Sequence, residues 1–158
     1  METDTATRWL TEAEQRTWRV HLEANRLLMY QLEKDLQPFG LTMNDYEILV
    51  NLSESKELRM RMSDLAAATL QSKSRLSHQI TRMENAGLVR REHCDTDRRG
   101  LFAVLTDHGL ETMQKVAPHH VDSVRRHFID LLSPEALAEL RASLTPVAEH
   151  LRKRRGRG

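Results

Sequence analysis

One amphipathic segment, residues 72–86, constrains the fold of this chain more than any other feature. Leu76, Ile80 and Met83 recur within it at the spacing of one helix face, which predicts a single buried stripe. Polar and basic side chains occupy its other positions, namely Lys73, Ser74, Arg75, Ser77, His78, Gln79 and Arg82. The pattern predicts a helix that Ser72 caps and that stops at the following glycine, with one side packed and a basic side exposed.

Two short runs of β-forming residues follow this segment, at 88–93 and 101–105, and predict a hairpin. The connection between them, residues 94–100, carries Arg98 and Arg99 near its middle. A basic helix backed by a hairpin with arginines at its tip is how a winged helix-turn-helix holds duplex DNA. The helix suits the major groove, and an arginine-tipped wing suits the minor groove.

The formal net charge of the whole chain is only +1, so the overall charge does not indicate a nucleic-acid partner. Between residues 71 and 100, however, seven lysines and arginines oppose four acidic residues, so this window carries +3. A local patch of this kind attracts phosphates without turning a nearly neutral protein into a polycation.

The region before the amphipathic segment predicts the rest of a compact lobe. A second helix starts at Thr42 or Asn44, and a short third helix covers residues 64–69 with Ser63 as its cap. Arginine and methionine alternate over residues 59–62 like a short strand, which could pair with the later hairpin.

Long helices are predicted on both sides of this lobe. One helix covers residues 11–37. In a second, apolar residues recur at helical spacing from Thr106 to Leu131 and across Pro118, and a third helix begins at Pro134. Their apolar stripes exceed what a minimal DNA-reading lobe must bury, so a second copy of the chain is the expected partner. We therefore divide one chain, residues 1–158, into a DNA-binding lobe, residues 42–106, and dimerisation helices, residues 8–38 and 107–154.

Composition excludes several other classes of protein. No apolar run is long enough to span a bilayer, and residues 1–4 lack a basic, apolar leader, so we expect a cytoplasmic protein without a membrane partner. A single cysteine, Cys94, rules out an internal disulfide framework and fits a reducing compartment.

Catalytic and metal-binding signatures are not found in the sequence. Serine, histidine and aspartate occur, but no nucleophile elbow, glycine-rich phosphate loop or carboxylate pair frames them, so we predict no enzyme and no cofactor. The eight histidines include the adjacent His119 and His120, yet none has a convincing metal-ligand spacing, and no metal site is predicted. A helical protein-interaction module and a metal-responsive regulator that uses helix histidines remain as alternatives.

The order and spacing of five short motifs resembles the MarR family of bacterial transcription regulators. These motifs are Ser-Asp-Leu-Ala at 63–66, Ser-Lys-Ser at 72–74, Glu-Asn-Ala-Gly-Leu-Val at 84–89, Asp-Arg-Arg-Gly at 97–100 and Val-Leu-Thr at 104–106. The resemblance covers essentially the whole chain. It implies a mainly α fold with a small β-hairpin wing, namely a winged helix-turn-helix whose long N- and C-terminal helices form a triangular homodimer. It also implies a palindromic operator, repression, and release by a small phenolic or anionic ligand.

The candidate DNA contacts divide into three groups. Base-edge candidates on the outer face of the helix are Ser74, Arg75, His78 and Gln79, although contact with phosphates alone is an equal alternative for each. Phosphate candidates are Ser72, Lys73 and Arg82. At the wing, Arg98 or Arg99 should enter the minor groove, with Asp97 pairing with Arg99. The resemblance favours Arg99, which occupies the family's wing position.

Two further surfaces are less clearly indicated. The family's ligand pocket lies between the dimer helices and the DNA lobe, which by resemblance points to Trp18, His21, Asn25, Tyr46 and Arg61. The basic run at 152–157 could touch DNA, but such a tail is more often frayed and merely solvated.

Overall fold

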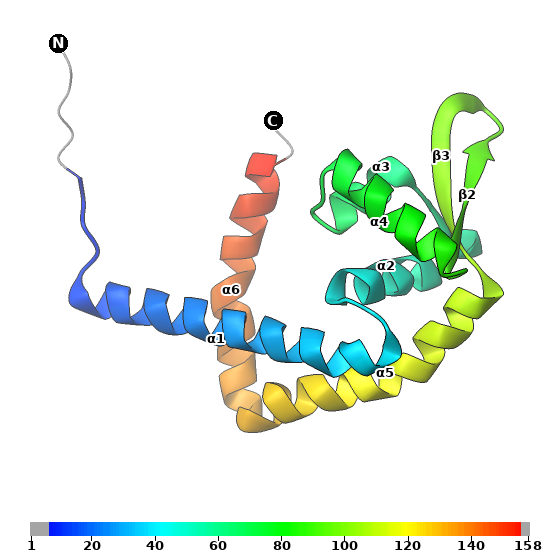
Figure 1. The fold of residues 1–158 in the computed structure, drawn as a ribbon. Coiled ribbons are helices and arrows are strands. Elements are labelled where there is room, and N and C mark those ends of the chain that lie inside the picture. Colours follow the sequence, from blue (N-terminus) through cyan, green and yellow to red (C-terminus); the bar gives the residue numbers. More distant parts are fainter. Residues whose placement is uncertain (1–6, 156–158) are drawn as a thin grey trace, which may run out of the picture.

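The computed structural model describes residues 7–155 and consists of helices around one small antiparallel sheet (Figure 1). The helices are α1 (Glu12–Leu36), α2 (Met43–Glu54), α3 (Met62–Ala68), α4 (Lys73–Asn85), α5 (Asp107–His127) and α6 (Pro134–Arg155). The strands are β1 (Arg59–Arg61), β2 (Val89–Cys94) and β3 (Asp97–Leu105), and 3₁₀ turns cover Gln37–Phe39, Lys56–Leu58 and Ile129–Leu131. Within the described residues, no helix combines the length and apolar character needed to cross a membrane.

Hydroxyl side chains define where most of these helices begin. Thr42 caps α2 in a capping box with Asp45, and Ser72 caps α4 by accepting a hydrogen bond from the backbone N–H of Arg75. Of the two predicted caps for α2, the structure therefore uses Thr42. The prediction that Ser63 caps α3 is wrong, because α3 starts at Met62 and the chain passes into it directly from the last residue of β1.

The sheet has the order β1-β3-β2, with both pairs antiparallel. Pairing of residues 59–61 with β3 confirms the predicted short strand. The predicted connection at 94–100 is too long, because β3 already begins at Asp97 and only Asp95 and Thr96 form the turn. A register shift between His93 and Cys94 lets Cys94 pair with Asp97, which extends the wing beyond the apolar runs that sequence periodicity detects.

The core of the lobe lies between α4, α2 and the sheet. Leu76, Ile80 and Met83 are each at most 1% exposed, which confirms the predicted stripe. They belong to one apolar cluster that also contains Ile48 and Leu49 of α2, with further members from α3, β2, β3 and α5. The helices α2 to α4 and the hairpin thus form a winged helix-turn-helix.

The long helices α1 and α5 extend away from this lobe, whereas α6 runs back toward it (Figure 1). α5 is anchored to α1 by Asp35, which accepts a hydrogen bond from Ser123 and lies 3.3 Å from His127 Nε2. Pro118 sits inside α5, but the helix ends at His127 rather than at Leu131, because the chain passes into the 3₁₀ turn that precedes α6. No residue of α6 is buried within the single chain.

Candidate nucleic-acid interface

Most of the predicted DNA-contact residues lie on the outward side of α4. Ser72 at the cap and Lys73, Ser74, Arg75 and His78 on the helix are all exposed. The buried stripe lies behind them, so these five side chains point away from the core.

Gln79 departs from the prediction that it lies on this outer face. It is only 8% exposed, and its Nε2 donates to Asp45 Oδ1 at 3.0 Å while its Oε1 accepts from Gln71 Nε2 at 2.9 Å. Because Gln79 lies three residues after Leu76, it borders the buried stripe on the side that faces α2. Its amide is therefore occupied inside the lobe.

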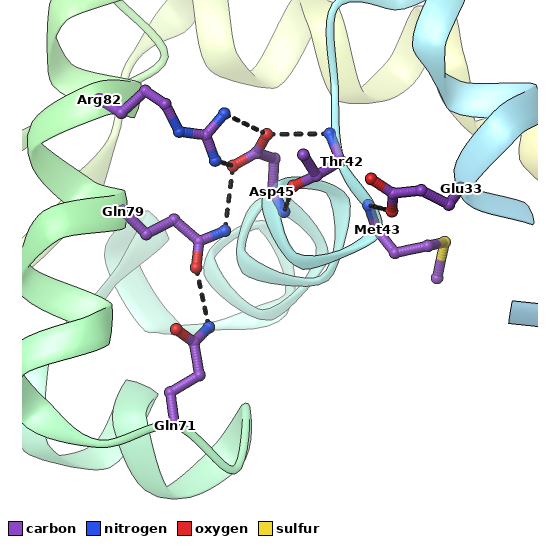
Figure 2. Close-up of polar contacts among 7 residues, drawn as sticks. All are labelled: Glu33, Thr42, Met43, Asp45, Gln71, Gln79 and Arg82. Carbon is purple, nitrogen blue, oxygen red and sulfur yellow. Dashed lines mark hydrogen bonds and ion pairs between the residues drawn. The ribbon is translucent and has the colours of Figure 1, made fainter. Parts of the chain in front are cut away.

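Asp45 organises the contact between α2 and α4 (Figure 2). Its carboxylate is 1% exposed and accepts from Arg82 Nη2 on Oδ1 at 2.6 Å and from Arg82 Nη1 on Oδ2 at 3.1 Å. The backbone N–H of Thr42 also donates to Oδ2, at 2.9 Å, as part of the capping box. One carboxylate thus caps α2 and holds two side chains of α4. Asp45 was not among the predicted site residues, although the Thr-x-x-Asp spacing of the capping box is visible in the sequence.

Two opposing effects set the pKa of Asp45. Burial raises the pKa of this carboxyl, but hydrogen bonds from Gln79, Thr42 and Arg82 outweigh it and hold the pKa below its ordinary value of 3.8. Asp45 is therefore ionised over the physiological range, and its charge compensates the guanidinium of Arg82.

A second clamp joins the wing to α4. Arg91 on β2 pairs with Glu84 at 2.9 Å, and its Nη2 donates to the backbone carbonyl of Ser77 at 2.8 Å. The same nitrogen also donates to the hydroxyl of Thr81 at 3.0 Å. These contacts fix the wing against α4, so the two elements keep a defined geometry relative to each other.

Residues 97–99 of the wing are described only through their backbone. Asp97, Arg98 and Arg99 start β3, but their side chains lie outside the described residues, so their predicted roles stay predictions. Nearer the base of the wing, Glu92 pairs with Arg90 and, at 3.1 Å, with Arg59 of β1.

An open groove of about 550 Å³ runs beside the exposed face of α4. Its lining residues are Glu33, Thr42, Asn44, Gln71, Arg75, His78, Gln79 and Arg82. Glu33 reaches it from α1 and accepts a hydrogen bond from the backbone N–H of Met43 at 2.7 Å (Figure 2). The groove is therefore lined by α1 as well as by the two helices that Asp45 connects.

The five predicted ligand-pocket residues are not brought together. Trp18 and His21 stack on exposed turns of α1, where Asn25 is exposed as well. Tyr46 is buried against His120, with ring centroids 4.4 Å apart, and Arg61 lies over the ring of Phe102 in the sheet. None of these five lines the groove beside α4.

Histidines do not gather into a metal centre in the part of the chain that the structure describes. Among the described side chains, which do not include those of residues 97–99, no three from histidine, cysteine or carboxylate residues come close enough together to hold a metal ion. His119 packs against Phe39 and His120 against Tyr46, so these adjacent histidines contact aromatic rings.

Comparison with known proteins gives consistent matches. The sequence model of the group described as "MarR family" matches residues 39–100. The HTH-type transcriptional regulator PecS of Dickeya dadantii (strain 3937) is 32% identical over 124 residues, which cover 76% of this chain and 72% of PecS.

Two solved structures from Streptomyces coelicolor are similar along nearly the whole chain. AbsC, a MarR family transcriptional regulator, is 80% identical with a TM-score of 0.90, and the match covers 93% of this chain and 99% of AbsC. Sco3205, a MarR family transcriptional regulator solved in complex with DNA, is 44% identical with a TM-score of 0.89, over 94% of this chain and 93% of Sco3205.

Replacing Asp45 tests the clamp between α2 and α4. Asp45→Asn should lower the free energy of unfolding by about 1–3 kcal/mol at neutral pH, because Arg82 and Gln79 lose a charged acceptor. Since the folded-state pKa is depressed, the stability from Asp45 is present above its unfolded pKa and lost as pH falls through the folded value. Urea unfolding from about pH 7 down to about pH 3 should therefore show the gap between wild type and variant closing.

Asp64→Asn, an exposed position on α3, is the matched control and should change stability by less than about 0.5 kcal/mol. A gap for Asp45→Asn that stays constant across this pH range would contradict the role assigned to the carboxylate.

Proposed function

This chain belongs to the MarR family of transcription regulators, and from that premise we propose that it binds a palindromic operator as a homodimer and is released by a small-molecule ligand. The observation that carries the proposal is the exposed polar and basic face of α4, held beside a wing by the Arg91 clamp. A helix of this width fits the major groove. The DNA complex of Sco3205, which is 44% identical, supports this assignment.

The residues of α4 take different roles in the proposal. Ser74, Arg75 and His78 read base edges, while Ser72 and Lys73 at the first turn bind phosphates, as backbone amides at a helix N-terminus also do. Gln79 is not assigned a DNA contact, because its amide already forms hydrogen bonds with Asp45 and Gln71.

Arg82 has two roles. Each of its terminal nitrogens makes one hydrogen bond to Asp45, and its side chain is still 55% exposed, so its remaining donors can reach a phosphate.

Dimerisation is supported by apolar surface that the single chain leaves uncovered. Trp9, Trp18 and Tyr30 of the N-terminal region are more than half exposed, and so are Val147 and Leu151 on α6. Exposure of such apolar stripes to water is unfavourable for a monomer, whereas a second copy of the chain would bury them across a two-fold axis.

Selection from a random duplex library, with sedimentation of the same sample, tests the operator and the dimer together. The protein should sediment as a dimer at micromolar concentration, and the selected duplexes should carry two inverted half-sites about one helical turn apart. A stable monomer, or selected sites without two-fold symmetry, would contradict the proposal.

Ligand release is supported by the groove beside α4. A small phenolic or other organic anion there would place negative charge against Arg75, His78 and Arg82, the same groups that face phosphates. Millimolar salicylate should therefore release the selected duplex, and neutral benzyl alcohol should not.

Arg75 and Lys73 provide a test of base reading against phosphate binding. Arg75→Ala should cost about 1–3 kcal/mol on the operator and relax the preference at one symmetric base position. Lys73→Ala should weaken binding to all duplexes alike and lower the salt slope by about 0.9. An unchanged preference profile for Arg75→Ala over a randomised operator library would show that Arg75 reads no base.

The wing arginines should be sensitive to the sequence that flanks each half-site. Narrow A·T-rich minor grooves have an enhanced negative potential, so Arg99→Ala, and to a lesser degree Arg98→Ala, should lose most affinity on A·T-rich flanks. Asp97→Ala should have a smaller effect, since it removes only the partner that orients the arginine. The test measures the affinity of each variant for operators with A·T-rich and with G·C-rich flanks. Equal losses of affinity on both would mean that the wing arginines make only generic phosphate contacts.

A further inference from the structure

The C-terminal end of α6 carries a cluster of positive charge. Its last turn contains Arg152, Lys153, Arg154 and Arg155, all of them exposed. The ion pairs found among residues 7–155 include none of these four side chains. Four adjacent cations on one helical turn repel one another, and an anionic partner would relieve that repulsion.

One hydrogen bond fixes where this turn lies. Arg155 Nη1 donates to the backbone carbonyl oxygen of Ala67 at 3.1 Å, although the two residues are 88 positions apart in the chain. Ala67 belongs to the last turn of α3, where its carbonyl also accepts from the backbone N–H of Leu70, and the C-terminal end of a helix favours a cation. α6 is otherwise unburied, so this bond sets the end of α6 against the DNA-binding lobe.

The position is close to the start of the proposed recognition helix. From Ala67 the chain needs only a short turn to reach Ser72, the cap of α4, and the exposed Lys73 and Arg75 follow. In Figure 1 the red end of α6 lies on the same side of the molecule as the beginning of α4 and the tip of the wing. The basic turn therefore extends the positive surface that begins at α4.

We propose that the basic end of α6, residues 152–155, is a second DNA-binding surface that contacts backbone phosphates next to the base pairs read by α4. The inference rests on the proposed function, because it assigns an additional contact on the same duplex. Lysine and arginine bind phosphate oxygens without reading base edges. This surface consequently raises affinity and salt dependence for every duplex and leaves the sequence preference to α4 and the wing.

Neutralising three of these charges tests the proposal. In the triple variant R152A/K153A/R154A, Arg155 is kept so that the bond to Ala67 is preserved. The slope of log K against log salt should fall by about 0.9 for each phosphate that the variant no longer neutralises. Affinity at about 0.1 M salt should drop roughly tenfold or more on the operator and on an unrelated duplex alike, so the ratio between the two stays the same.

The control variant R125A/R126A/R141A removes the same net charge from exposed positions in the last turn of α5 and in the first half of α6. It should keep the salt slope of the wild type. The charge-preserving pair R152K/R154K should keep it as well, which separates charge from helix packing. Sedimentation and helical circular dichroism of every variant check assembly and folding.

Three outcomes would count against the basic end of α6 as a DNA-binding surface. If wild type binds DNA and the triple variant has the same salt slope, the basic end binds no phosphate and the inference is overturned. If the triple variant loses its oligomeric state with an unchanged slope, the basic turn contacts the second copy and the inference is again overturned. If the wild-type protein binds no duplex at all, both the proposed function and this inference are overturned.

Discussion

The orientation of α4 depends on one buried carboxylate. Asp45 closes the capping box of α2, and the same two oxygens receive Arg82 and Gln79 from α4. An unpartnered ionised carboxylate in this position would cost several kcal/mol, so the hydrogen bonds that surround it are a requirement of the fold. Rotating α4 away from α2 would leave Asp45 buried without its partners. The outer face of α4 therefore keeps its orientation because the hydrogen bonds of Arg82 and Gln79 to Asp45 fix the side of α4 that faces α2.

The same N-terminal turn of α2 also contacts α1. Glu33 on α1 accepts from the backbone N–H of Met43, two residues before Asp45 (Figure 2). Asp35, further along α1, holds Ser123 and His127 of α5. Of the helices proposed to form the dimer, α1 thus contacts the turn that positions α4 through a hydrogen bond to its backbone, and α5 is joined to α1. In the proposed dimer, a shift of α1 would act on α2 at the point where α2 is bonded to α4.

Local patterns predicted the elements, and contacts between distant residues decided the details that differ. The stripe of Leu76, Ile80 and Met83 and the cap at Ser72 are contained in fifteen residues, so the sequence alone located α4. The burial of Gln79 depends on Asp45, which lies 34 positions earlier, and no helical periodicity contains that information. The pocket prediction came from resemblance instead, and Tyr46 turned inward against His120 while Trp18 and His21 stayed on the exposed side of α1.

Pairing of charges explains how a chain of net charge +1 can present a strongly basic surface. Within the window of +3, Arg82, Arg90 and Arg91 form ion pairs with Asp45, Glu92 and Glu84, so neighbouring carboxylates compensate much of their charge. Among the described residues of that window, the cations without such a partner are Lys73 and Arg75, at the first turn of α4. A helix N-terminus adds its own partial positive charge at the same place. The acidic residues therefore concentrate the positive field where α4 begins, beside the basic end of α6, and this location matters more for attracting a polyanion than the sum over the chain.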